Sequence, residues 1–370
     1  MPIEPYRKLF LLAVVLGLAG VGLWPLHFAT YTSYPLPSHQ HFMIFGMFLS
    51  FVSGFLMTAL PKMSGAQPAS NLETQLAVAL IFFSSLLSLL GYEAIAVIFA
   101  AGQFAHLFIF IGRRLVVRQK NPPTGFLFVP LGLFWGFTGV VLKELQIQNI
   151  NLGSYGFALV PIALYQAFLL NLIIGLGSRL IPFLTRTEQI NPMQAGSGGL
   201  FNLALIHAAF LNIGFLLEPI LSTSVTYSLR TLVLLSAAIS MFGILRRSAE
   251  FSVLGIGIRL SVFAMILGMV GLALFPENRL ALLHVIFISG FALLTLMIAT
   301  RVVLAHGGHS LTIERSSWYL GLVIGLLLLA TTFRGFYYLN LAAGAWILAL
   351  FVWFFEIGSK LLKNDSGPSL

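Results

Sequence analysis

Long runs of apolar residues, interrupted by proline, glycine or charged residues, extend along almost the whole chain. A helix needs about 20 such residues to cross the hydrocarbon core of a bilayer. The pattern therefore predicts an all-α polytopic membrane protein with about twelve transmembrane helices. The expected spans are residues 9–28, 39–60, 75–90, 93–112, 124–142, 155–177, 200–217, 223–243, 251–275, 280–304, 318–333 and 337–358.

Several connections between the expected spans are very short. Gly91 and Tyr92 join the third span to the fourth, and a turn from Pro276 to Arg279 joins the ninth to the tenth. Helices joined so closely form antiparallel hairpins, so we predict one transmembrane helical domain over residues 1–370. The first apolar run follows basic residues as a signal peptide would. It lacks a clear small-x-small cleavage site, and we expect it to remain as the first helix.

Composition excludes a soluble protein and narrows the chemistry. The chain is 58% hydrophobic and 8% charged, with a mean hydropathy of +0.97. It has no cysteine, which excludes disulfides, iron–sulfur clusters and thiolate ligands. Histidine, methionine, tyrosine and carboxylates remain as possible metal ligands, so the eight histidines become the main candidates.

The basic residues give the chain an orientation, because Lys and Arg accumulate in cytoplasmic loops. Three of them, Lys143, Arg279 and Arg334, lie on one side, and Arg230 and Arg259 lie within spans. The other side carries fifteen, which places both termini in the cytoplasm. The net charge of +9 is thus a topology signal, and we expect no nucleic-acid partner. The fifteen are Arg7, Lys8, Lys62, Arg113, Arg114, Arg118, Lys120, Arg179, Arg186, Arg246, Arg247, Arg301, Arg315, Lys360 and Lys363.

Histidines within the apolar runs are candidates for function, because ionisable groups at membrane depth are costly. His39 and His41 lie at the entrance of the second span. His284 lies near the corresponding end of the tenth span, and His27 closes the first. All four share a depth near the outer face. They could share a metal or haem site, or they could be interfacial histidines bonded to headgroups or carbonyls, which is the favoured interpretation for His27.

The spacing of His39 and His41 limits what they can bind together. Residues two apart on a helix point about 200° apart, so the pair cannot easily chelate one ion. Either His39 lies in a non-helical turn after Pro37 and folds back, or each imidazole serves a different centre. Met43 and Met47 are soft enough for copper, but packing is the favoured role for methionines at this spacing.

A second candidate group lies at the cytoplasmic helix ends. Arg179 closes the sixth span, and Arg301 and His306 close the tenth. The two guanidinium groups could clamp an anion such as a haem propionate, or they could be topology anchors. A haem held there would lie nearer the inner face than the outer histidines. The two placements therefore compete unless the protein has two centres.

Two further features concern the middle of the chain. His207 is expected near mid-membrane on the seventh span, where a hydrogen bond to a neighbouring helix is favoured over ligation of a metal. Three spans also end in similar segments, and their spacing of four spans fits three four-helix repeats. These segments are Thr58 to Pro61, Ser178 to Pro182 and Thr300 to Leu304.

Four ordered motifs make the chain resemble the NnrS family over most of its length. Two departures are Phe42, where the family usually has Glu, and Ala305, where it usually has Gly. The missing carboxylate weakens any proton-relay or ligand role expected at residue 42. The matching positions are His39, His41, Met43, Phe45 and Gly46; Gly54 to Pro61; Arg179, Ile181, Pro182 and Thr185; and His284, Met297, Arg301, His306 and Gly308.

The resemblance implies a bacterial cytoplasmic-membrane protein that binds haem and copper and acts against nitric oxide and nitrosative stress. Its expected cofactor-binding residues are His39, His41, His284, Arg179, Arg301 and His306. His207, which none of the family motifs covers, is a further candidate metal ligand from its position alone. If it is an enzyme, it is an oxidoreductase acting on nitric oxide.

Two alternatives remain open beside this function: a membrane transporter of copper, haem or a nitrogen oxide, and a membrane sensor or assembly factor. The twelve spans also resemble the haem–copper oxidase superfamily in architecture, which would give the repeats a three-fold arrangement. The sixth span lacks the histidine of that superfamily, and the seventh lacks its usual pair.

Overall fold

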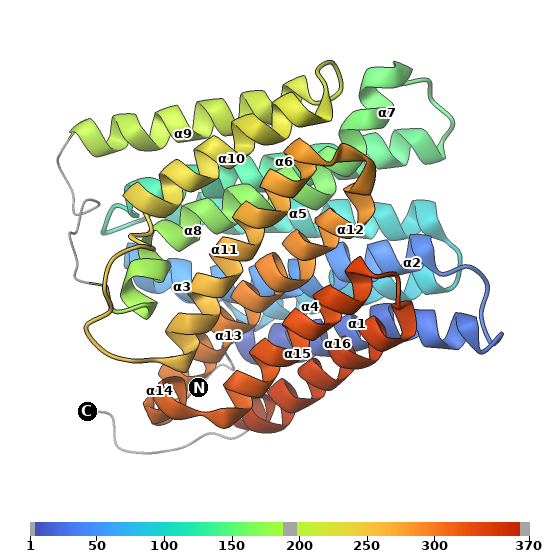
Figure 1. Ribbon diagram of the computed structural model, residues 1–370. Helices are drawn as coiled ribbons and strands as arrows, with labels where there is room; N and C mark the ends of the chain where they lie inside the picture. Colours follow the sequence, from blue (N-terminus) through green and yellow to red (C-terminus); the bar gives the residue numbers. More distant parts are fainter. Residues whose placement is uncertain (1–3, 188–197, 363–370) are drawn as a thin grey trace. The chain divides into compact units, whose positions relative to one another are not determined.

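The computed structural model describes residues 4–187 and 198–362, which are largely helical and contain no β-strand (Figure 1). The predicted all-α fold of a polytopic membrane protein is confirmed. The α-helices are α1 (Pro5–Phe28), α2 (Leu36–His41), α3 (Leu49–Ser64), α4 (Asn71–Leu89), α5 (Glu93–Val116), α6 (Phe128–Ile147), α7 (Gly153–Ile162), α8 (Phe168–Leu184), α9 (Gly198–Leu217), α10 (Thr223–Ser240), α11 (Val253–Leu274), α12 (Arg279–His284), α13 (Leu293–His306), α14 (Thr312–Ser316), α15 (Trp318–Gly335), α16 (Leu339–Trp353) and α17 (Ser359–Leu362). The 3₁₀-helices are η2 (Thr124–Leu127) and η4 (Pro276–Asn278), and the π-helices are η1 (Phe42–Phe48), η3 (Ala163–Ala167), η5 (Val285–Ala292) and η6 (Phe354–Gly358).

Within the described ranges, ten helical stretches are long and apolar enough to cross a membrane. They coincide with ten of the predicted spans. The seventh and eighth predicted spans are occupied by α9 and α10. The described apolar stretch of α9, Phe201–Leu217, is shorter. α10 carries seven serine and threonine residues together with Arg230, which make it less hydrophobic.

The second, sixth and tenth spans each contain a π-helix, and these three π-helices have a common register. Thr58, Arg179 and Arg301 each follow the first residue of their own π-helix by 16 residues. His41 and His284 occupy the equivalent position directly before η1 and η5, and Ile162 occupies it before η3. π-Helices are rare and concentrate at functional sites, so their regular recurrence supports three four-helix repeats.

Each of these three π-helices packs against a glycine in the transmembrane span that precedes its own span in the chain. A Cβ built on Gly20 of α1 would lie 2.7 Å from the Phe42 Cβ. On Gly139 of α6 it would lie 3.0 Å from the Ala163 Cβ, and on Gly268 of α11 it would lie 2.5 Å from Ile286 Cγ1. Larger side chains would separate these helices, so the first helix of each repeat approaches the second in the same way.

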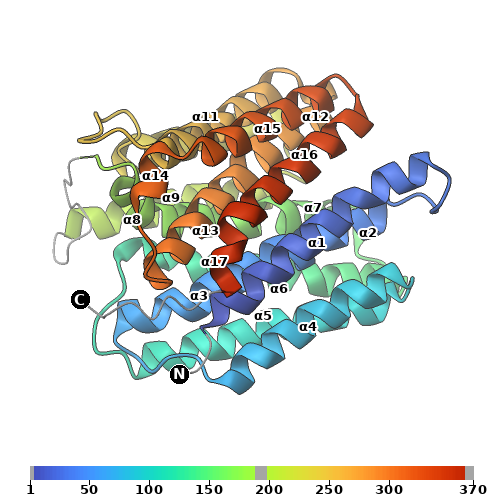
Figure 2. The same ribbon diagram turned by 90° about the horizontal axis from the view of Figure 1, so that it is seen from below.

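The chain divides into two compact units, the first formed by residues 1–121 and 295–370 and the second by residues 122–294. In the first unit, α1 packs against α3, η1 and α16, and α15 and α16 lie side by side as a hairpin (Figure 2). In the second unit, α6 packs against α8, and α11 packs against α10 and η5. The single domain expected from the sequence stays a prediction.

The predicted orientation can be tested with single cysteines, because the chain has none of its own. Ile150 and Val117 are exposed residues in the connections that follow the fifth and fourth spans. With both termini in the cytoplasm, we expect a membrane-impermeant maleimide to label Ile150→Cys in intact cells. Val117→Cys should be labelled only after the membrane is opened. Labelling of Val117→Cys alone in intact cells would reverse the topology.

Candidate functional site

His39 and His41 both lie in the regular helix α2, which has a proline in its first turn. Proline is tolerated there because the first helical N–H groups have no partner within the helix. The expectation of a non-helical turn that lets His39 fold back is therefore wrong. The two imidazoles have different surroundings, which agrees with the alternative that each serves a different centre.

The His39 ring is held in one orientation by α1. Its Nδ1 donates a hydrogen bond to the carbonyl oxygen of Gly20, 2.9 Å away. A carbonyl oxygen only accepts, so Nε2 keeps its lone pair. Histidines that bind metals are commonly held in this way through their second nitrogen. The Trp24 indole lies edge-on to the ring, with 5.8 Å between the centroids.

His41 is fully buried between α4 and α5. Ser84 Oγ donates to the Ala96 carbonyl, so this hydroxyl oxygen accepts from His41 Nε2, 2.8 Å away. His41 Nδ1 lies 3.6 Å from Glu93 Oε1, and the other oxygen of Glu93 accepts from Ser88 Oγ at 2.8 Å. Glu93 of α5 thus places a carboxylate beside His41, although residue 42 is Phe. Sequence reasoning missed it, although it opens the fourth span at the depth of His41.

His284 and His27 are also hydrogen-bonded, whereas neither ring nitrogen of the buried His106 in α5 has a hydrogen-bond partner among the described residues. His284 Nδ1 donates to the carbonyl of Leu280 at 2.7 Å, which leaves the lone pair on Nε2, as in His39. His27 Nδ1 donates to the carbonyl of Thr32 at 3.0 Å, in line with the favoured carbonyl-bonded interpretation.

His207 uses both ring nitrogens. Its Nδ1 lies 2.7 Å from the Leu203 carbonyl oxygen, and its Nε2 lies 3.0 Å from Ser236 Oγ of α10. This arrangement agrees with the favoured interpretation of a helix-bridging residue.

The residues at the cytoplasmic helix ends have separate partners. Arg301 Nη1 lies 2.8 Å from both carboxylate oxygens of Glu314, which is buried. Arg179 is exposed and has no ion-pair partner among the described residues. Arg301 thus holds the buried carboxylate of Glu314 from the same chain.

His306 belongs to a polar cluster at the start of α1. Lys62 Nζ lies 2.5 Å from His306 Nδ1 and 2.7 Å from Glu4 Oε1. Glu4 Oε2 lies 3.6 Å from the same imidazole nitrogen. Burial raises the pKa of Glu4, but the hydrogen bonds and charges of His306 and Lys62 outweigh burial and lower this pKa to about 2.

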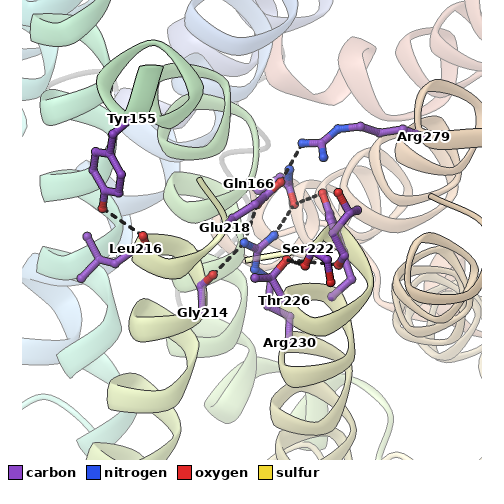
Figure 3. A network of polar contacts seen from close by, with 11 residues as sticks. Tyr155, Gln166, Gly214, Leu216, Glu218, Ser222, Thr226, Arg230 and Arg279 are labelled. Atoms are coloured by element: carbon purple, nitrogen blue, oxygen red, sulfur yellow. Dashed lines mark hydrogen bonds and ion pairs between the residues drawn. The ribbon is translucent and has the colours of Figure 1, made fainter. Parts of the chain in front are cut away.

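A buried charge network lies in the second unit, at the ends of α9 and α10 (Figure 3). Glu218 bridges two arginines, at 2.5 Å from Arg230 Nη2 and 2.7 Å from Arg279 Nη2. Gln166 of η3 accepts hydrogen bonds from Arg230 Nη1 at 3.1 Å and from the Tyr227 hydroxyl at 2.8 Å. An arginine within an apolar run was the sequence signal for this network.

These features define a multi-pass helical membrane protein with hydrogen-bonded histidines at membrane depth. Within the described residues, no group of three or more histidine, cysteine or acidic side chains is arranged to hold a metal ion. The family model described as NnrS protein matches residues 3–364, so the chain belongs to the NnrS family. A comparison with curated proteins finds no match.

Removing the bridging carboxylate should destabilise the second unit. Glu218→Gln leaves the fully buried Arg230 without its counter-charge, which costs about 3–5 kcal/mol in comparable pairs. We expect a clearly lower temperature of thermal unfolding in detergent. Glu277→Gln removes an exposed carboxylate near Arg279 and should change stability by less than about 0.5 kcal/mol. Equal unfolding temperatures for the two variants would refute a stabilising role of the network.

Glu4 should make the stability of the folded protein depend on pH in the acid range. Its pKa of about 2 in the folded protein lies below the ordinary value of 4.5. Its contribution is therefore complete above about pH 4.5 and is lost as the pH falls toward 2. Because the carboxylate is one-third exposed, solvent screening limits the effect to about 1 kcal/mol. Glu4→Gln should weaken this acid dependence, measured as unfolding temperature against pH, whereas Glu277→Gln should retain it.

Proposed function

We propose that this protein binds haem and copper in the bacterial cytoplasmic membrane and acts on nitric oxide, by reduction or scavenging, in defence against nitrosative stress. Membership of the NnrS family supports the connection with nitric oxide. The observation that carries cofactor binding is the tautomer of His39, because its Nε2 keeps the lone pair that iron or copper requires.

The donor set fits the proposed groups. Imidazole is a ligand for haem iron and for copper. His39 and His284 each have Nδ1 fixed by a backbone carbonyl, so neither ring needs to change its tautomer to bind a metal. The bound metal would supply the site that takes nitric oxide. We propose no metal role for His207, because both of its nitrogens have partners.

The remaining candidate residues are proposed to act beside the cofactors. His41 is held by Ser84 and Glu93, which favours a role as a polar neighbour over that of a direct ligand. Arg301 is occupied by Glu314, so a propionate there would have to displace a buried carboxylate. Arg179 remains a candidate anion site at the cytoplasmic side.

A transporter of copper, haem or a nitrogen oxide is the second candidate function. The buried network of Arg230, Glu218 and Arg279 favours it, because charged groups inside membrane proteins often mark the path of a substrate. A transporter would bind its substrate reversibly, and nitric oxide would not alter a resident cofactor.

Absorption spectra of the purified protein, with and without nitric oxide, test the proposal. We expect a Soret band that shifts with the gas. His39→Ala and His284→Ala should each lower haem or copper content by about tenfold or more, because each removes a ligand. His207→Ala is the matched control and should keep both contents.

Two results would count against this function. A folded wild-type protein that takes up neither haem nor copper would refute cofactor binding. A Soret band whose position does not change when nitric oxide is added would refute the action on this gas and favour transport. Unchanged metal and haem content in both His39→Ala and His284→Ala would reject the ligand assignments while leaving the function open.

A further inference from the structure

Arg334 lies on the side of the membrane where basic residues are few. The predicted topology puts Lys143, Arg279 and Arg334 there, against the usual accumulation of basic residues on the cytoplasmic side. Arg279 is explained by its ion pair with Glu218. Lys143 is half-buried near the end of α6. Arg334 is partly buried at the end of α15 and forms no ion pair with another described residue.

The guanidinium group of Arg334 is incompletely satisfied. Its Nη1 is buried and has no hydrogen-bond partner in the described parts of the chain. Its nearest aromatic contact is the Tyr337 ring, 5.8 Å from the guanidinium carbon. A buried donor without a partner costs free energy, and more so on a charged group. An acceptor from outside the described residues, such as a water, a lipid headgroup or a bound anion, would satisfy this donor.

The helix α2, which carries His39, and the end of α15, which carries Arg334, lie at the same end of the first unit (Figure 2), and the positive charge of Arg334 acts on the His39 imidazole. Both residues belong to the first unit, in which α1 packs against α2 and α16, and α15 forms a hairpin with α16. His39 contacts α1 through the carbonyl oxygen of Gly20 and the indole ring of Trp24. The lone pair on His39 Nε2 and the unsatisfied donor of Arg334 therefore lie at the same end of the first unit.

The charge decides which kind of group fits beside His39. A bare copper ion at Nε2 would be repelled by the arginine, because like charges disfavour each other in a region of low dielectric constant. A metal group that carries its own carboxylates would be attracted instead. Guanidinium and carboxylate form paired hydrogen bonds that are about twice as strong as neutral ones.

We propose that Arg334 binds a carboxylate of an iron porphyrin whose metal is bound by His39, so that His39 serves haem rather than a bare copper ion. This proposal rests on the proposed function. It adds a binding residue on the outer side, where the sequence indicated only histidines as candidates. His284 then remains as the candidate ligand for copper.

The test compares porphyrins with and without free carboxylates. Haem-free full-length protein in detergent is titrated with haem and with haem dimethyl ester, for wild type, Arg334→Gln, Arg334→Lys and the outer-side control Lys143→Gln. We expect Arg334→Gln to weaken haem binding by about 10- to 100-fold. Arg334→Lys should lie between the two. The dimethyl ester should bind equally to all four proteins, because its esterified propionates carry no negative charge that could pair with the arginine.

Other anions define the outcomes that contradict the proposal. If Arg334→Gln weakens haem and ester equally, the arginine is structural. If added nitrite or a phospholipid headgroup competes with haem in wild type but not in Arg334→Gln, the arginine binds that anion instead. If His39-dependent haem binding is the same in wild type and Arg334→Gln, the proposal fails while the proposed function stands. A wild type that binds no haem refutes the proposed function first.

Discussion

The organisation of this protein depends on one constraint, that polar groups in hydrocarbon must find partners inside the protein. Helices satisfy the backbone, and the charged side chains are satisfied in pairs. Arg230 and Arg279 share Glu218. Arg114 binds both oxygens of Glu73 with its two terminal nitrogens, at 2.5 and 2.7 Å. Arg334 and His106 depart from this pattern, because each has a buried nitrogen without a partner among the described residues.

Three π-helices, η1, η3 and η5, lie at the same register in the second, sixth and tenth spans. A π-helix changes the direction of the side chains that follow it, and it leaves local backbone geometry that is costly to maintain. Its recurrence at one register indicates that the feature belongs to the repeat and is not a local accident. His41 and His284 precede η1 and η5, whereas Ile162 precedes η3, so the equivalent positions differ in chemistry.

The two histidines of α2 have separate surroundings although they lie within one turn of helix. His39 meets a carbonyl of α1, and His41 meets a serine and a glutamate from α4 and α5. Because the two residues point to opposite sides, one imidazole can hold a metal while the other remains in a hydrogen-bonded pair. This separation supports a cofactor with a polar neighbour more than it supports a two-histidine chelate.

The sequence by itself determined the helical class, the approximate spans, the expected orientation and the NnrS motifs. These follow from local properties, namely the length of apolar runs, the positions of charges and the spacing of motif residues. Only the tertiary structure decided that Glu93 faces His41, that Glu314 occupies Arg301 and that Lys62 and Glu4 meet His306. These partners lie on other helices or across turns, and a hydropathy pattern does not specify which faces of two helices meet. The choice depends on side-chain packing, such as the glycine contacts that bring α1 against η1.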